Sequence, residues 1–369
     1  MIGGRSKEAQ VKRIGVLTGG GDAPGLNAVL RAVVKTAENE FGWQVTGIED
    51  GFEGLMGATR TRPLTCDDVR GLLPRGGSIL GCVNRGHFAV HEVDGKLVKD
   101  QAAYEEAFAN FRALGLSALI VIGGEGSQRI GYEFSQMGMP VVGVPKTIDN
   151  DLIGTDLTFG FDTALDIATE AIDRLHTTAE SHDRIMLLEV MGRHAGWIAL
   201  QSGVAGGADV ILIPEIPFHV ERIVEKIRER EREGRHFSII VVAEGAVAAG
   251  GLPSYIDLGG PDRMARLGGV ADRVGLEISR VTGKESRVVV LGHLQRGGTP
   301  TAFDRVLASC YGSAAVRAIA ADKFSQMVSW RCSEVVTVPL EQCVNGLKTV
   351  SLDHYLVKVA RDLSISFAG

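Results

Sequence analysis

Short apolar runs rich in valine, isoleucine and leucine alternate along this chain with longer amphipathic segments. The runs occupy residues 13–18, 43–49, 118–123, 140–145, 184–190, 209–214, 237–244 and 287–292. Nearly all are apolar on both faces, which is typical of strands that helices cover on both sides of a sheet. The segments between them have the helical period, so the pattern predicts an α/β fold with mainly parallel strands and crossover helices.

Glycine-rich turns follow four of these runs. They read TGGGDAPGLN at 18–27, GGEGSQRIG at 123–131, MGRHAG at 191–196 and GHLQRGG at 292–298. Ligands of open α/β sheets bind outside the carboxyl ends of the strands, so we expect the chemistry at these turns. The first two turns open helices, whose N–H groups favour an anion, and together they indicate a substrate with several phosphates. For either turn alone, an ordinary tight turn is the alternative.

Residues 145–151 read PKTIDND and follow directly on one of the runs. In an extended backbone alternate side chains share a face, so we expect Thr147, Asp149 and Asp151 to point the same way. Carboxylates held this close repel one another unless a cation, a proton or a hydroxylic substrate lies among them. The alternative is a solvated loop that caps the next helix.

Charged side chains mark the ends of several strands. Arg184 and Arg287 begin runs, Glu244 ends one, Arg193 lies in MGRHAG, and His293 and Arg296 lie in GHLQRGG. The planar guanidinium group suits phosphate oxygens, and a neighbouring histidine adds a further hydrogen bond. A surface charge is the alternative for any one of these arginines, and helix capping is the alternative for Glu244.

The chain has 369 residues, more than one ordinary core supports, which predicts two lobes. Its formal net charge of -6 argues against nucleic acid or an anionic membrane surface as partner. No apolar run has the length of a signal-peptide core at the start or of a membrane span later, so we expect a soluble, cytoplasmic protein. The five cysteines form no CxxC pair, which favours reduced thiols.

These motifs resemble the 6-phosphofructokinases of the bacterial type. The segments that carry the resemblance run in family order from about residue 12 to residue 321: GGGDAPGLNAVLRAVV, RGGSILG, VIGGEGS, PKTIDNDLIGTD, GFDTAL, EAIDRL, EVMGRHAGWIAL and VLGHLQRGGTPTAFDR. The resemblance implies two Rossmann-like lobes with mainly parallel sheets, an active site in the cleft between them, and self-association into a homodimer or homotetramer.

The expected division of the chain follows from that resemblance. Residues 1–158 would form a larger lobe that binds the nucleotide phosphates, with 287–325 returning to it. Residues 159–286 would form a smaller lobe that binds fructose 6-phosphate, and residues 326–369 would pack on the lobes.

The resemblance also implies roles for the catalytic residues. Asp149 would be the base for the 1-hydroxyl of fructose 6-phosphate. Asp151 and Glu125 would position the Mg²⁺ of the nucleotide. Thr147 would hold the transferred phosphoryl group by a hydrogen bond, and Arg193 would neutralise its developing charge.

Further residues are expected to bind the two substrates. Contacts with the sugar phosphate fall on Arg184 and Arg287, a pair often supplied by two subunits, on His293 and Arg296, and on Met191, Gly192 and Glu244. Contacts with the nucleotide phosphates fall on Gly20, Gly21, Arg85, Glu125, Gly126, Ser127 and Lys146. Arg85 stands one place later than the arginine of the best-known ATP-dependent pattern.

Two markers of the phosphoryl donor disagree. Lys146 resembles the pyrophosphate-using branch, whereas that branch normally carries aspartate where this chain has Gly126. An aspartate would put a carboxylate against the α-phosphate of a nucleotide, so we give Gly126 more weight and expect Mg-ATP as donor. Pyrophosphate-dependent transfer is the alternative. A non-catalytic sugar-phosphate-sensing subunit is an alternative of another class, which would be expected to lose Asp149 or Arg193.

Overall fold

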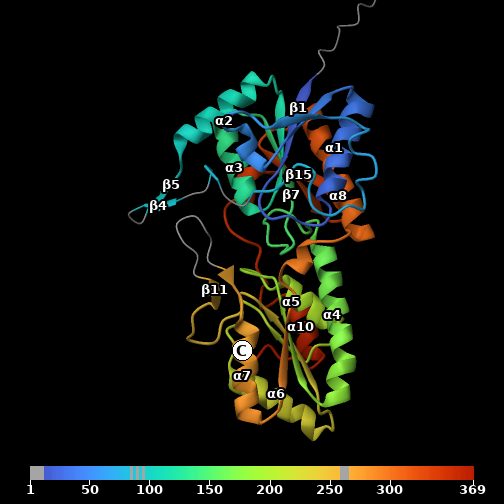
Figure 1. The fold of residues 1–369 in the computed structure, drawn as a ribbon, viewed down its shortest axis with the longest axis vertical. Coiled ribbons are helices and arrows are strands. Elements are labelled where there is room, and N and C mark those ends of the chain that lie inside the picture. Colours follow the sequence, from blue (N-terminus) through green and yellow to red (C-terminus); the bar gives the residue numbers. More distant parts are fainter. Residues whose placement is uncertain (1–11, 84–85, 89–90, 94–95, 258–265) are drawn as a thin grey trace, which may run out of the picture. The chain divides into compact units, whose positions relative to one another are not determined.

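The computed structural model describes residues 12–83, 86–88, 91–93, 96–257 and 266–369 (Figure 1). Its contacts divide the chain into two compact units. The first unit comprises residues 1–147, 152–160 and 298–346, and the second comprises 148–151, 161–297 and 347–369. Within the described residues, no helix is both long enough and apolar enough to cross a membrane.

The first unit is built on a seven-stranded sheet of order β15-β14-β7-β6-β1-β2-β3. Its strands are β1 (Arg13–Thr18), β2 (Gln44–Ile48), β3 (Thr61–Leu64), β6 (Ala118–Gly123), β7 (Val141–Pro145), β14 (Gln326–Arg331) and β15 (Glu334–Pro339). The five central strands are parallel, and the edge strands β3 and β15 are antiparallel to their neighbours. A separate hairpin pairs β4 (His91–Val93) with β5 (Lys96–Val98).

Helices cover both faces of this sheet. They are α1 (Leu26–Phe41), η1 (Gly51–Leu55), α2 (Gln101–Ala113), α3 (Glu125–Gln136), α8 (Ala302–Ala320) and α9 (Leu340–Cys343). Alternate residues of β6 enter two different cores: Ile120 packs with α1 and α8, whereas Val121 packs with α2 and α3. This explains why the run at 118–123 is apolar at every position, as the sequence predicts.

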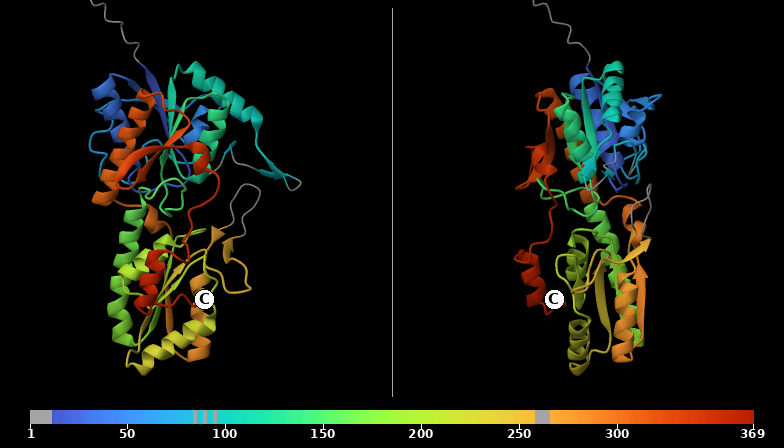
Figure 2. Two further views of the ribbon diagram at one scale, coloured as in Figure 1. Left: turned by 180° about the vertical axis from the view of Figure 1, so that it is seen from behind. Right: turned by 90° about the vertical axis from the view of Figure 1, so that its left-hand side faces the viewer.

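The second unit contains a parallel four-stranded sheet of order β13-β8-β10-β9. Its strands are β8 (Ile185–Val190), β9 (Val210–Leu212), β10 (Ser238–Ala243) and β13 (Ser286–Val290), and a two-stranded piece joins β11 (Tyr255–Asp257) to β12 (Arg266–Leu267). The helices are α4 (Phe161–His182), α5 (Trp197–Ala205), α6 (Val220–Arg232), α7 (Val270–Thr282), η2 (Gly292–Arg296) and α10 (Tyr355–Asp362). The apolar sides of α6 and α7 pack on one face of the sheet, and α4 and α5 contact the strands as well (Figure 2).

All eight predicted strands are present, as β1, β2, β6, β7, β8, β9, β10 and β13. The division into units differs from the expected one at the C-terminal side. Residues 287–297 stay in the second unit because the valine-rich β13 pairs with β8. Residues 326–346 do not pack as a separate segment, because β14 pairs with β7 and extends the first sheet.

Candidate functional site

The two glycine-rich turns of the first unit, at residues 18–27 and 123–131, meet at the side chain of Ser127. They follow the adjacent parallel strands β1 and β6, and Gly19 N donates to Ile122 O across 2.9 Å. A Cβ on Gly19 would lie 2.5 Å from Ser127 Oγ, and one on Gly123 would lie 2.3 Å from Ser127 Cβ. Only glycine permits this approach, so the turns present their backbone on both sides of Ser127, as a phosphate cradle requires.

Gly126 faces open space at the start of α3. A Cβ at this position would meet no atom within 4 Å. The N–H groups of the first helical turn have no intrahelical partner, so this open space is suited to a negatively charged group. Gly20, with φ of +74°, completes the neighbouring turn, and its N–H donates to Val83 O across 3.2 Å.

Lys146 ties the end of β7 to both turns. Its side chain is buried, its ammonium group donates to Gly21 O, and its backbone N–H donates to Gly123 O across 3.0 Å. A Cβ at Gly20 would come within 3.5 Å of Lys146 Nζ. The structure therefore brings together Gly20, Gly21, Gly126, Ser127 and Lys146, which the sequence placed in one phosphate site.

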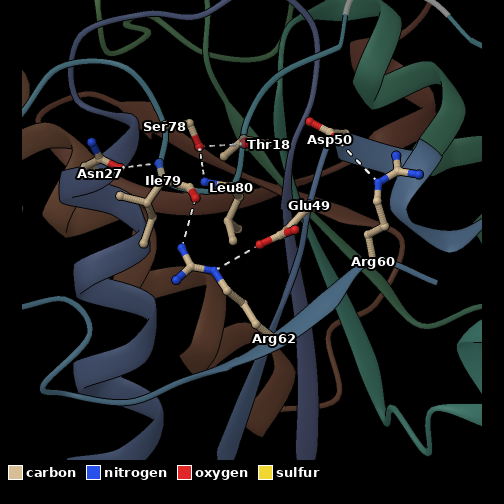
Figure 3. Close-up of polar contacts among 9 residues, drawn as sticks. All are labelled: Thr18, Asn27, Glu49, Asp50, Arg60, Arg62, Ser78, Ile79 and Leu80. Atoms are coloured by element: carbon tan, nitrogen blue, oxygen red, sulfur yellow. Dashed lines mark hydrogen bonds and ion pairs between the residues drawn. The ribbon is translucent and has the colours of Figure 1, made fainter.

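The loop at residues 75–81 is fixed beside the first turn by polar contacts, which Figure 3 shows. Ser78 Oγ lies 2.8 Å from Thr18 Oγ1 and accepts from Leu80 N across 3.1 Å. Asn27 Oδ1 accepts from Ile79 N across 2.9 Å, and Arg62 Nη2 donates to Ile79 O across 2.9 Å. The chain beyond this loop leads to Arg85, which lies outside the described residues.

Glu125 opens α3 and is bonded within its own helix. Its Oε1 accepts from Arg129 Nε across 2.8 Å. Among the described residues, no cluster of three or more histidine, cysteine or acidic side chains has the geometry of a metal site. Magnesium commonly takes one or two carboxylates and completes its shell with water and substrate phosphates, so the carboxylate of Glu125 has the chemistry of a ligand for that ion.

The aspartate loop, residues 148–151, groups with the second unit, whereas Thr147 belongs to the first. Our expectation that Thr147, Asp149 and Asp151 share one face of an extended backbone is wrong. The chain turns here, and Asn150 has φ of +49°, a left-handed conformation that asparagine tolerates better than most residues. The simple alternation of side chains therefore does not apply across Asn150.

At the carboxyl edge of the second sheet, two neighbouring strands bring four predicted residues together. They are Met191, Gly192 and Arg193 after β8 and Glu244 after β10. Gly245 N donates to Gly192 O across 3.2 Å, and Glu244 N donates to Val190 O across 2.9 Å. Gly192 has φ of +135°, and a Cβ at Gly245 would fall 2.1 Å from Arg193 O, so both glycines are structurally required.

A buried glutamine joins η2 to this edge. Gln295 is fully buried and its Oε1 accepts from Met191 N across 2.8 Å. His293 and Arg296 flank Gln295 within η2, directly after β13. Sequence reasoning missed Gln295, although a glutamine between a histidine and an arginine in a glycine-bounded motif was an available signal.

Arg184 and Arg287 lie at the opposite edge of the same sheet. Arg184 precedes β8 and Arg287 is the second residue of β13. The six residues of β8 span about 20 Å, so one phosphate cannot contact Arg184 and the residues after β8 in the same chain. A single chain therefore cannot bring Arg184 and Arg287 to the same phosphate as His293 and Arg296, so the expected grouping would need the arginine pair of a second subunit.

Glu285 lies between these two arginines. Arg184 Nε donates to Glu285 Oε2 across 2.5 Å, and Arg287 Nη2 forms an ion pair with Glu285 Oε1. The hydrogen bond from Arg184 and the charges of both arginines hold the pKa of Glu285 below its usual value. The two guanidinium groups thus already converge on one bidentate anion, which is the arrangement that a phosphate would need.

Comparison with known proteins assigns these motifs to one family. A sequence model of the phosphofructokinase family matches residues 13–319. This chain belongs to the phosphofructokinase family. The ATP-dependent 6-phosphofructokinase of Chloroflexus aurantiacus is 58% identical over 356 residues, which cover 96% of this chain and 98% of that protein.

Other relatives are named for a different phosphoryl donor or have longer chains. The pyrophosphate–fructose 6-phosphate 1-phosphotransferase of Amycolatopsis methanolica is 52% identical over 345 residues, covering 93% of this chain and 97% of that protein. The crystal structure of Pichia pastoris phosphofructokinase is similar with a TM-score of 0.79 and 31% identity, over 97% of this chain and 37% of that chain. The family and its fold are those that the sequence motifs predicted.

Proposed function

We propose that this chain is an ATP-dependent 6-phosphofructokinase, which transfers the γ-phosphoryl group of ATP to the 1-hydroxyl of D-fructose 6-phosphate. The observation that carries the choice of donor is the open space at Gly126, which leaves room for a nucleotide phosphate at the start of α3. The name of the 58% identical Chloroflexus relative supports the same donor.

The first unit would bind the donor. Gly20 would leave room for the donor in the first turn. Phosphate oxygens would be held by backbone N–H groups at Gly21 and Gly126, by the Ser127 hydroxyl and by the Lys146 ammonium. Arg85 is proposed to add a further phosphate contact from sequence alone. Glu125 and Asp151 would hold Mg²⁺, which neutralises charge on the phosphates when it is bound.

The transfer itself would use three residues around the reacting oxygen. As O1 of the sugar bonds to the γ-phosphorus and the bond to the ADP oxygen breaks, Asp149 would accept the proton that leaves O1. Thr147 would orient the phosphoryl group, and Arg193 would stabilise its developing charge. Met191, Gly192, Glu244, His293 and Arg296 would hold the sugar phosphate.

Arg184 and Arg287 require a second copy of the chain in this proposal. They lie at the far edge of the sheet from Met191, so they would grip the 6-phosphate bound to another subunit. This geometry favours a homo-oligomer, either a dimer or a tetramer, whose sites are completed across its interfaces.

Pyrophosphate-dependent transfer is the second candidate, and Lys146 is the observation that favours it. Its ammonium group lies against the first glycine-rich turn, at Gly20 and Gly21, where it would meet the end of a short anionic donor. The Amycolatopsis relative bears a pyrophosphate-dependent name.

The proposed activity is tested by following fructose 1,6-bisphosphate formation from fructose 6-phosphate and Mg-ATP. Asp149→Ser is the matched inactive control, because it removes the proposed base and retains a small polar side chain. Product formation by the unmodified protein and not by this variant would support the assignment. No product from the unmodified protein would refute it.

A further inference from the structure

The C-terminal segment, residues 347–369, belongs to the second unit and lies beyond the residues that the family model matches. It begins by contacting the aspartate loop. Lys348 Nζ donates to Asn150 Oδ1 across 3.0 Å, and Lys348 N donates to Asp151 O across 2.7 Å. The first of these bonds joins residues 198 positions apart, so no local sequence signal announces it.

We propose that Lys348 is a positioning residue, which holds the aspartate loop in the conformation that presents Asp149. This inference rests on the proposed function, because it assigns importance to the loop as the carrier of the base. The side chain of Lys348 bonds Asn150 and its backbone bonds Asp151, which are the two residues that directly follow Asp149. The loop is thereby clamped at the two positions immediately after the proposed base.

The conformation of Asn150 explains why a clamp is needed. Asn150 is buried, with 4% of its surface exposed, and its φ of +49° lies in the sparsely populated left-handed region. A buried amide oxygen that loses its donor is costly, and a charged donor makes the stronger bond. Removal of the lysine ammonium should therefore release the loop toward other backbone conformations.

The same segment is also anchored to the turn that carries Arg193. Trp197 Nε1, in the first turn of α5, donates to Lys348 O across 2.7 Å. Glu215 Oε1 accepts from both Val350 N, across 2.7 Å, and Gly196 N, across 3.0 Å. Lys348 thus lies in one hydrogen-bonded chain between the aspartate loop and the residues that follow Arg193.

The test is Lys348→Met, which keeps a long side chain but removes the donor, while the backbone bonds of residue 348 remain. We expect kcat with fructose 6-phosphate and Mg-ATP to fall about 10- to 100-fold, because small misplacements of reacting groups have effects of this size. The KM values should change less than about threefold, since the substrate contacts are untouched. Lys348→Arg should restore a large part of kcat.

Lys358→Met is the matched control, because Lys358 lies on α10 in the same segment with an exposed side chain. It should leave kcat unchanged. Hydrogen–deuterium exchange at the backbone amides of residues 148–152 gives a readout that does not depend on activity. Exchange there should be faster in Lys348→Met than in the unmodified protein and the control, with the thermal unfolding temperature nearly unchanged.

Unchanged kcat and unchanged exchange in Lys348→Met would overturn the inference. So would a fall in kcat that accompanies a general loss of stability and that Lys348→Arg does not reverse. If the unmodified protein shows no phosphofructokinase activity, the proposed function fails, and the exchange measurement alone then decides whether Lys348 clamps the loop.

Discussion

Replacing Gly126 by aspartate should change the stability of the protein and its use of ATP in opposite directions. Gly126 lies in the first turn of α3, it is not among the glycines with positive φ, and an added Cβ would meet nothing within 4 Å. Removal of a helical glycine and placement of a carboxylate near a helix N-terminus each contribute about 0.3–1 kcal/mol. The free energy of unfolding should therefore rise by about 0.6–2 kcal/mol.

Binding of ATP should respond in the opposite sense. A carboxylate about 5 Å from one phosphate charge, at an effective dielectric constant of about 20, costs about 3 kcal/mol, which corresponds to about a 150-fold loss. The assay is kcat/KM for Mg-ATP at saturating fructose 6-phosphate, with thermal unfolding in parallel. The KM for fructose 6-phosphate should be unaffected.

Gly126→Asn is the matched control because asparagine has nearly the same volume as aspartate and no charge. The loss of kcat/KM for Mg-ATP should be much smaller in Gly126→Asn than in Gly126→Asp. Equal losses in the two variants would show that volume rather than charge opposes the nucleotide. An undiminished kcat/KM for Mg-ATP in Gly126→Asp would refute the placement of a nucleotide phosphate at the start of α3.

Three further perturbations test the remaining parts of the site. Asp149→Ser should lower kcat by at least about 100-fold. If two chains share each site in a dimer, a mixture of Asp149→Ser refolded with an equal amount of Arg287→Ala should regain about a quarter of wild-type activity. No regain in the mixture would place both residues' functions within one chain. Glu285→Gln should lower the KM for fructose 6-phosphate about two- to fivefold, because the carboxylate that occupies the arginine pair is removed. Since Arg184 keeps the pKa of Glu285 low, this change in KM should not vary between about pH 6 and pH 9. A raised KM in Glu285→Gln would contradict the prediction. Lys146→Met should leave kcat with Mg-ATP within about tenfold, measured at saturating substrates, and a larger loss would give Lys146 a direct part in ATP transfer.

The sequence predicted the sheets well because burial on both faces requires continuous apolar runs. The run at 118–123 supplies residues to two cores, and this leaves an unambiguous pattern. The glycine turns were equally visible, since close backbone approach beside Ser127 excludes any side chain. The edge strand β15 and its neighbour β14 were missed because polar residues interrupt both segments, so neither forms a continuous apolar run.

The contacts that hold the site were beyond sequence reasoning for a different reason. Gln295 and Lys348 act through bonds to residues more than 100 positions away, and such partners depend on the tertiary fold. The left-handed conformation of Asn150 likewise depends on its surroundings, because an isolated asparagine has several accessible conformations. The separation of Arg184 and Arg287 from His293 became visible only when the strands had a common direction and register.

The choice between the two donors is the central claim, and a direct comparison of rates tests it. Initial rates should be measured with the unmodified protein at saturating fructose 6-phosphate, once with Mg-ATP and once with Mg-pyrophosphate. The open space at Gly126 predicts the faster rate with Mg-ATP. A faster rate with Mg-pyrophosphate would contradict this account and would make Lys146 the residue that decides the donor.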